Sequence, residues 1–329
     1  MTLRRRTHNR QRGVALIMAV LIVALATMLA ASVSFKGYLD QRRSANAFAL
    51  DQGFEVALGG EAWAADSLRR DKQQSSKTDD FTEEWATPIP PIPIDNGQFE
   101  GQLEDMQGRF NLNSLVMQGG QGGQGGQLIE DKAARERFER LLELLELETK
   151  WATIITDWID TDIQPSFPEG AEDPTYTGLS PPYRTANMPL TRASELLAIT
   201  GFGLERYRKL EPFVTALPIG TSINLCTASP ELLDALVAGR RQFTLARETT
   251  METRKERCFP TVDDYKNGGL TVEQTQELVQ GKVVDQTSSY FRSTIWVTIG
   301  TTQFTLYSLL YRSGNNGLVR PILRSHGTP

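Results

Sequence analysis

The sequence predicts an α+β protein, in which a long N-terminal helix packs on a small antiparallel sheet and a helical domain interrupts the strands. Residues 14–70 are rich in alanine and nearly free of helix breakers. Residues 290–329 read as short strands divided by turn signals, whereas residues 128–289 read mainly as helices. A chain of 329 residues is long enough for two or three such folding units.

Histidine and cysteine are so scarce that several kinds of site are excluded. The chain holds two of each, His8, His326, Cys226 and Cys258. Zinc sites with several histidines or four cysteines are therefore impossible, and a bound metal must have oxygen ligands. A Ser-His-Asp centre would depend on His326, close to the C-terminus. No other nucleophile or general base stands out, so we expect no enzyme.

The first 35 residues predict a membrane-spanning helix. Residues 1–13 hold five arginines and no acid, and residues 14–35 hold no charged residue. A helix over residues 14–35 spans roughly 33 Å, enough to cross a bilayer. The arginines should stay in the cytoplasm, which places the rest of the chain in the periplasm of a bacterial cell. A cleaved signal peptide is the alternative, but the helical pattern continues to about Arg70.

The charge of the body disfavours nucleic acid as a partner. The chain has 35 basic and 40 acidic residues, and five of the basic ones lie in residues 1–13, which leaves 30 against 40 and a net charge of −10. Such a body repels phosphate backbones. We therefore expect no nucleic acid partner.

The start of the apolar helix resembles a known processing signal. Gln11-Arg12-Gly13, followed by Val14-Ala15-Leu16-Ile17-Met18, is similar to the leader of type IV pilins and type II secretion pseudopilins. The resemblance implies that a prepilin peptidase cleaves between Gly13 and Val14 and methylates the new N-terminus at Val14. Major pilins carry Glu where this chain has Met18. A buried carboxylate without a partner is costly, so a subunit with nothing above it has no use for that Glu.

The loss of the Glu and the unusual length resemble the K-type minor pseudopilins, the general secretion pathway protein K family. The resemblance implies a pilin fold with a large inserted helical domain containing SAM-like or helix-hairpin-helix units. It implies a tip complex with I- and J-type minor pseudopilins that initiates pseudopilus assembly and controls its length during export across the outer membrane. The chain would be a single-pass protein of the bacterial inner membrane, with its C-terminal domain in the periplasm.

Changes in composition divide the chain into six expected segments. They are the leader (1–13), the N-terminal helix (14–70, membrane-spanning in 14–35), a linker with the first strands (71–117), a flexible Gly/Gln tether (118–127), the helical insert (128–289) and the C-terminal sheet (290–329). Gly53 and the pair Gly59-Gly60 are candidate bends in the long helix. A proline-rich run over residues 88–93 predicts an extended linker.

Strands are expected on both sides of the insert. Gln98–Glu104 and Gly108–Asn113 read as two strands that could form a hairpin. Near the C-terminus, turn signals at residues 300–302 and 314–317 separate three further strands. Pro321 should place the last of these at an edge of the sheet, since proline cannot donate to a neighbouring strand.

The insert shows helices, an internal repeat and one unit of ambiguous function. Helices are expected over residues 131–148, 150–159 and 192–197, with Thr191 as an N-cap, and another should begin at Ser229-Pro230. Residues 109–115 resemble residues 222–228, and each precedes a helical segment. Residues 196–212 look like a helix-hairpin-helix unit. Such units contact DNA phosphates or serve as protein-interaction modules. The acidic body favours the second, and a periplasmic DNA-binding pilin-like protein is the alternative function.

One acidic stretch is a candidate calcium site. Calcium prefers six to eight oxygen ligands from a loop that can curl around it. The candidate ligands are Asp157, Asp160, Asp162, Glu172 and Asp173. A solvated acidic loop is the alternative, and the family resemblance favours structural calcium. Asp263 and Asp264 form a weaker candidate for a second site.

The two cysteines read as a disulfide. Cys226 and Cys258 are an even pair in a compartment predicted to be oxidising. In the chain-entropy model the bridge would contribute about 3–4 kcal/mol to stability. A reactive thiol is the alternative.

Overall fold

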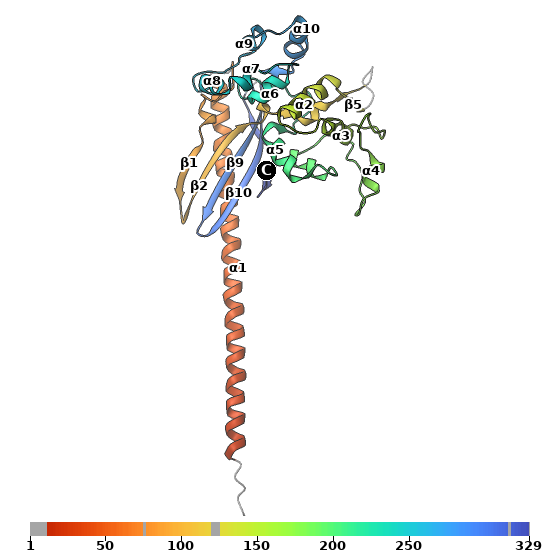
Figure 1. Cartoon of the computed structure of the whole chain (residues 1–329). Coiled ribbons are helices and arrows are strands. Elements are labelled where there is room, and N and C mark those ends of the chain that lie inside the picture. The colour runs from red at the N-terminus through yellow and green to blue at the C-terminus, as the bar shows by residue number, and fades with distance from the viewer. Residues whose placement is uncertain (1–11, 75–76, 120–125, 315–316, 329) are drawn as a thin grey trace, which may run out of the picture.

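The long N-terminal helix is the largest element of the structure. The computed structural model describes residues 12–74, 77–119, 126–314 and 317–328. Helix α1 (Arg12–Gln74) runs through 63 residues without a break, which corresponds to about 95 Å. Figure 1 shows its first half projecting from the body as a bare shaft, and its second half lying against the sheet. Residues 1–11 of the 13-residue leader and residues 120–125 of the Gly/Gln tether lie outside the described residues.

A five-stranded antiparallel sheet covers the second half of α1. Its strands are β1 (Ile89–Ile94), β2 (Gly97–Asp105), β9 (Tyr290–Ile299), β10 (Thr302–Arg312) and β11 (Val319–His326), in the order β1-β2-β9-β10-β11. The central pair β2–β9 joins residues that the insert separates in sequence, as Gln98 opposite Thr298 illustrates. The predicted α+β architecture is confirmed.

Prolines mark both edges of the sheet. Pro321 lies on β11, the last strand, as its missing N–H predicts. The run over residues 88–93 was expected to be a linker, yet it forms the opposite edge strand, β1. An edge strand needs hydrogen-bond donors on one side alone, so the prolines of β1 cost the sheet little there.

The expected hairpin of residues 98–104 and 108–113 is wrong. Strand β2 pairs with β1 and β9 instead. The chain turns at a 3₁₀ segment, η2 (Met106–Gly108), and enters the insert through β3 (Phe110–Asn111). Phe110 is buried in the main core of the insert, which therefore begins earlier in the chain than residue 128.

The insert is built from short helices and from strand pairs of two or three residues. Its remaining elements are η3 (Leu112–Leu115), β4 (Val116–Gln118), β5 (Leu128–Glu130), α2 (Lys132–Leu144), α3 (Lys150–Ile159), α4 (Asp173–Thr177), η4 (Ala193–Ala198), α5 (Gly203–Leu210), η5 (Glu211–Phe213), β6 (Val214–Thr215), β7 (Ile223–Asn224), α6 (Pro230–Ala235), α7 (Gln242–Leu245), α8 (Arg247–Thr253), α9 (Val262–Asn267), α10 (Val272–Thr275), η6 (Gln276–Gln280) and β8 (Val284–Asp285). A further 3₁₀ turn, η1 (Glu84–Ala86), precedes β1.

The internal repeat predicted from the sequence is structural. Each copy begins with a short strand, β3 in the first copy and β7 in the second. Helices follow each strand, and a later strand then returns to pair with it in parallel: β6 with β3, and β8 with β7. The side chain of Asn111 accepts a hydrogen bond from the N–H of Asn113, and that of Asn224 accepts one from Cys226. Equivalent asparagines thus turn the chain in both copies.

Of the two predicted N-cap residues, one is confirmed and one is wrong. Ser229 caps α6, since its hydroxyl accepts from the N–H of Leu232 at 3.2 Å. Thr191 is not an N-cap. The 3₁₀ segment η4 begins at Ala193, and the hydroxyl of Thr191 donates to Glu195.

Small residues on α1 allow it to lie close to the sheet. Gly53 faces Phe304, and Gly60 faces Ile295, where an added Cβ would lie 3.0 Å from the isoleucine side chain. Ala57 and Ala64 are buried along the same side. The glycines were expected to bend the helix, but α1 continues through them, because here their lack of a side chain serves close packing.

An ion pair fastens the far edge of the sheet to the same helix. Glu61 of α1 is 5% exposed and accepts two hydrogen bonds from the guanidinium of Arg324 on β11, at 2.7 and 2.8 Å. A forked pair of this kind fixes direction as well as distance. The edge strand is therefore held in register with α1.

Gly60→Val should lower the stability of the protein by about 2 kcal/mol, because the new side chain overpacks the contact with Ile295. Gly59→Ala is the matched control, since nothing lies within 4 Å of the position of its Cβ. The control should keep or raise the midpoint, because alanine is the better helix former. Thermal unfolding of the full chain in detergent, followed by circular dichroism, measures both. Equal midpoints for wild type and Gly60→Val would contradict the close packing.

Candidate functional site

The predicted acidic stretch forms a cluster at the end of α3. Carboxylate oxygens of Asp160, Asp162 and Glu172 all lie within 4.8 Å of one another. Asp160 ends α3, and Glu172 precedes α4 on the returning chain. Asp160 and Glu172 are 4% and 0% exposed. No cation from an arginine or lysine is paired with any of the three, as far as the described part of the chain shows.

Several buried oxygens around this cluster accept no hydrogen bond. They are Asp157 Oδ1, Asp160 Oδ1, Glu172 Oε1 and Asn187 Oδ1. A buried acceptor without a partner costs free energy, and four of them around one acidic group require a cation or water. The donor set is made of oxygen alone and is rich in charge, which suits Ca²⁺ better than a transition metal. The residues present therefore fit a calcium ion.

Electrostatics in the cluster point the same way. Burial, together with the charges of the neighbouring acids, raises the pKa of Asp160 to about 7. Burial is also the main cause that raises the pKa of Glu172 to about 7. The carboxylates repel one another and lack a counter-charge from the protein, so a divalent ion would relieve the repulsion.

The other predicted ligands of the first site have mixed roles. Asp157 shapes the loop, because its Oδ2 accepts from the N–H groups of Ser166 at 3.0 Å and Ala171 at 2.9 Å. Asp173 lies outside the group of three and accepts from the hydroxyl of Thr185. Asn187 was missed by sequence reasoning, because a single asparagine far along the chain from the acids carries no spacing signal.

The weaker second candidate site does not assemble. Asp264 accepts from the N–H of Thr261 in the capping box of α9 and forms an ion pair with Arg257 at 2.9 Å. Asp263 is exposed. The two acids belong to the first turn of a helix, where carboxylates satisfy free N–H groups and favour the helix dipole.

A second acidic group, which the sequence did not reveal, lies where the insert joins the sheet. Asp71, Asp79 and Glu83 bring their carboxylates within 4.8 Å of one another. Arg312, 1% exposed, forms ion pairs with Asp71 at 2.8 Å and with Asp79. Burial raises the pKa of Glu83 to about 8. The arginine already supplies the counter-charge, so this group is a structural junction.

The same junction continues into the insert through Asp105. This carboxylate ends β2 and accepts hydrogen bonds from Thr227, Ser288 and Asn224 at 2.6, 2.7 and 2.9 Å. The amide of Asn224 also donates to the backbone oxygen of Asp79. Asn224 is the turn asparagine of the second repeat copy. One buried network therefore connects the sheet, the insert and the end of α1.

The predicted disulfide is confirmed, and an arginine reinforces it. Cys226 and Cys258 are bonded. Arg254, 3% exposed, donates to the backbone oxygens of Leu225 at 2.9 Å and Phe259 at 2.6 Å, beside each cysteine. Burial lowers the pKa of Arg254 to about 10. Two independent links therefore hold the same pair of segments.

The helix-hairpin-helix unit is formed by η4 and α5, with Gly201 and Gly203 in the left-handed region at φ 79° and 78°. Two of its three cations are engaged by acids, and the third, Arg208, is exposed. Arg206 donates to Glu148 at 2.6 and 2.9 Å, and Lys209 lies 3.5 Å from Glu146. Cations paired in this way are poorly placed for phosphate, which weighs against the DNA-binding alternative.

The apolar half of α1 is exposed on all sides. Within the described residues, one helix is long and apolar enough to cross a membrane, with a mean hydropathy of 2.8 in its most apolar window and none of that window buried. This agrees with a single membrane anchor. Val14 is the third residue of α1.

Comparisons with known proteins agree on one family. Residues 108–219 match the family model described as type II secretion system (T2SS), protein K. The chain is 31% identical to the type II secretion system protein K of Pectobacterium carotovorum subsp. carotovorum, over 97% of this chain and 98% of that protein. It is 32% identical to the protein K of Pseudomonas aeruginosa, over 96% of this chain and 93% of that protein.

A solved structure supports the fold. A chain in the crystal structure of the GspK-GspI-GspJ complex from the enterotoxigenic Escherichia coli type 2 secretion system superposes with a TM-score of 0.72. The alignment covers 88% of this chain and 100% of the other, at 23% identity.

Calcium should raise the thermal midpoint of the protein, and a chelator should lower it.

Without the ion, stability should fall as pH rises. The ordinary pKa values, 3.8 for Asp160 and 4.5 for Glu172, are raised in the folded state to about 7. The folded protein therefore binds protons more tightly between pH 4 and pH 7, and this advantage is lost as pH approaches 7.

Asp160→Asn combined with Glu172→Gln should abolish the response to calcium and weaken the response to pH, part of which remains because burial also raises the pKa of Glu83. Asp263→Asn should keep both responses. Differential scanning calorimetry of the full chain across pH, with and without calcium, measures the effect. A midpoint that ignores millimolar calcium in the wild type would exclude the site.

Arg312→Ala should lower stability by about 3–5 kcal/mol, because it leaves Asp71 and Asp79 buried without a counter-charge. Arg320→Ala is the matched control, since Arg320 lies exposed on β11 and contacts the ring of Tyr311. The control should change stability by less than about 1 kcal/mol. Denaturant unfolding of the full chain in detergent compares them, and similar values for the two variants would refute the role of the junction.

Proposed function

Because the chain belongs to the type II secretion system protein K family, we propose that it is a minor pseudopilin that forms the tip of a pseudopilus. In this role it initiates assembly and controls filament length during protein export across the outer membrane. Its partners are the I- and J-type minor pseudopilins, and the solved relative is named as a complex with GspI and GspJ. Its work is assembly rather than catalysis.

The bare half of α1 is the observation that carries this proposal. Residues such as Leu16, Met28 and Val33 are each more than 65% exposed. An all-round apolar helix is stable in lipid, and it leaves lipid at low cost if other apolar helices cover it equally well. The shaft therefore suits a subunit that moves from a membrane into a helical bundle.

The insert explains why this subunit would lie at the tip of the pseudopilus. Figure 1 shows it beside and above the sheet, at the end of the molecule away from the shaft. A further subunit stacked on that end would meet the insert rather than another shaft. Met18 agrees with this position, because the helix carries no acid there that would need a positive partner on a subunit above.

The anchor sets the orientation. The arginines of residues 1–13 hold that end of the helix in the cytoplasm, and the sheet and insert lie in the periplasm. Prepilin peptidase cleaves between Gly13 and Val14 and methylates Val14. A disulfide between Cys226 and Cys258 suits the periplasm, where such bonds persist.

Calcium has a structural role in this proposal. Asp160, Asp162 and Glu172 would hold the ion, with Asp157 and Asn187 supplying further oxygens. The bound ion would neutralise the acids and stabilise the loop between α3 and η4. It takes no part in a reaction.

Co-purification tests the tip role. The full chain, expressed with the I- and J-type minor pseudopilins of the same secretion system and extracted in mild detergent, should elute as one ternary complex. Native mass spectrometry gives the stoichiometry. Elution as a separate monomer at every protein and calcium concentration would refute the proposal, and a salt-sensitive complex with DNA would favour the alternative instead.

A further inference from the structure

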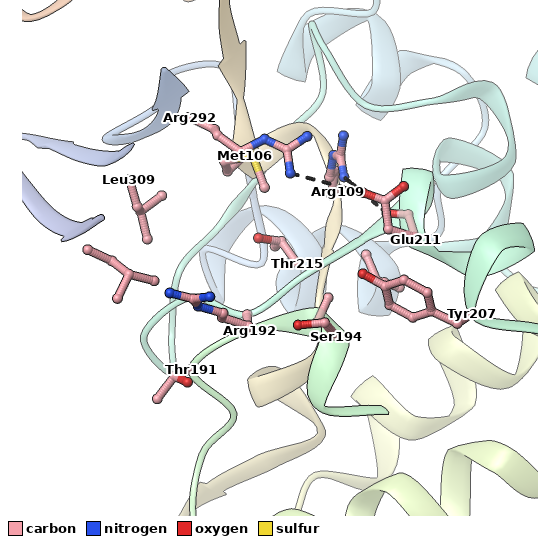
Figure 2. A pocket seen from close by; sticks show the side chains of 14 residues that line it. Met106, Arg109, Thr191, Arg192, Ser194, Tyr207, Glu211, Thr215, Arg292 and Leu309 are labelled. Carbon is pink, nitrogen blue, oxygen red and sulfur yellow. Dashed lines mark hydrogen bonds and ion pairs between the residues drawn. The ribbon is translucent and has the colours of Figure 1, made fainter. Parts of the chain in front are cut away.

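A cavity lies between the outer face of the sheet and the insert. Leu309 of β10 and Leu323 of β11 line it from the sheet, and Arg192 and Ser194 line it from the start of η4. Its volume is about 80 Å³. Figure 2 shows Leu309 on one side of the gap and Arg192 and Ser194 on the other, so the cavity belongs to both parts of the molecule.

Two of the three arginines around the cavity are already paired. Arg109 forms ion pairs with Glu104 and Glu211, and Arg292 contacts Glu104 at 2.6 Å. Burial alone would raise the pKa of Glu104, but the charges of Arg109 and Arg292 outweigh it and lower that pKa. This group of two arginines and two glutamates is electrically balanced.

The third arginine, Arg192, has no such partner. No carboxylate pairs with its guanidinium within the described residues. Glu195, an acid on the same turn, accepts at Oε1 from the N–H groups of Thr191 and Arg192 and from the hydroxyl of Thr191. In Figure 2 the Arg192 guanidinium reaches away from its own loop toward Leu309. The result is one positive charge over an apolar wall.

A half-buried guanidinium of this kind favours a specific ligand chemistry. Arginine presents a planar fork that matches a carboxylate, and the pair gains strength as water is excluded. The apolar wall suits the aliphatic stem that carries such a carboxylate. A glutamate or aspartate side chain meets both requirements.

The position of the cavity indicates where that side chain comes from. Leu323 belongs to β11, the last strand of the sheet, whose one described neighbour is β10. Ile322, the next residue along this edge, is 45% exposed. A polypeptide that lies along β11 would cover Ile322 and pass the mouth of the cavity.

We propose that an acidic side chain of a neighbouring minor pseudopilin enters this cavity beside β11 and pairs with Arg192. This rests on the proposed function and extends it, since it names one contact that joins the tip subunits. The ligand bridges the sheet and the insert, because the walls of its cavity come from both.

Charge reversal tests the contact. Arg192→Glu should weaken the association of the full chain with the I- and J-type minor pseudopilins by about thirtyfold or more, as expected for breaking a buried charge pair. Arg192→Lys should weaken it less, because it keeps the charge and loses the fork. Arg241→Glu is the matched control, since Arg241 is an exposed arginine of the insert outside the cavity. The control should bind as the wild type does.

Ser194→Phe provides a second variant that changes no charge. The bulky ring would fill the mouth of the cavity and should weaken association as Arg192→Glu does. Microscale thermophoresis in detergent measures the affinities, and thermal unfolding confirms that each variant is folded. The affinity lost in Arg192→Glu should be restored when one acidic residue of the partner is replaced by arginine.

The outcomes separate this inference from the proposed function. If the wild type forms no complex, both are overturned. If the wild type forms the complex and Arg192→Glu or Ser194→Phe binds equally well, the inference alone is overturned. An equal loss for Arg241→Glu would show a general effect of charge and would also overturn it.

Discussion

The buried guanidinium of Arg312 is the contact on which the arrangement of the molecule depends. It donates to the backbone oxygens of Leu68 on α1 and Ser288 at the start of the returning strand, and it pairs with Asp71 and Asp79. The chain leaves the sheet at Asp105 and comes back at Ser288, and those two residues are themselves hydrogen bonded. An insertion of this size is tolerated in a small sheet because its entry and exit are held within a single hydrogen-bonded network.

The two acidic clusters show that residue type alone does not determine role. Asp71 and Asp79 share a buried arginine, so their charge is compensated by the protein itself. Asp160 and Glu172 are equally buried, but their free oxygens have no protein donor. The difference lies in whether a cation from elsewhere in the sequence reaches the site, and that is a property of tertiary structure.

The sequence predicted those features that have local causes. The long apolar helix, the C-terminal strands, the edge position of Pro321, the cap at Ser229 and the internal repeat all follow from periodicity, turn chemistry or missing donors, and the structure has them. The errors arose where distant contacts decide. Proline-rich residues 88–93 became a strand because β2 was available to pair with them, and Gly60 became a packing site because Ile295 lies opposite. Asn187 and the Arg312 group carry no spacing signal, since their partners lie far away along the chain.

The close contact of α1 with the sheet has a mechanical consequence. Gly53 and Gly60 keep the layer of side chains between helix and strands thin, and the Glu61–Arg324 pair adds a link at the far edge. A thrust along the rod therefore loads the strands in shear, across many backbone hydrogen bonds at once, instead of peeling them apart one by one. These contacts resist sliding and rotation of the sheet on α1, so a force applied to the helix is passed on to the sheet and to the insert attached to it.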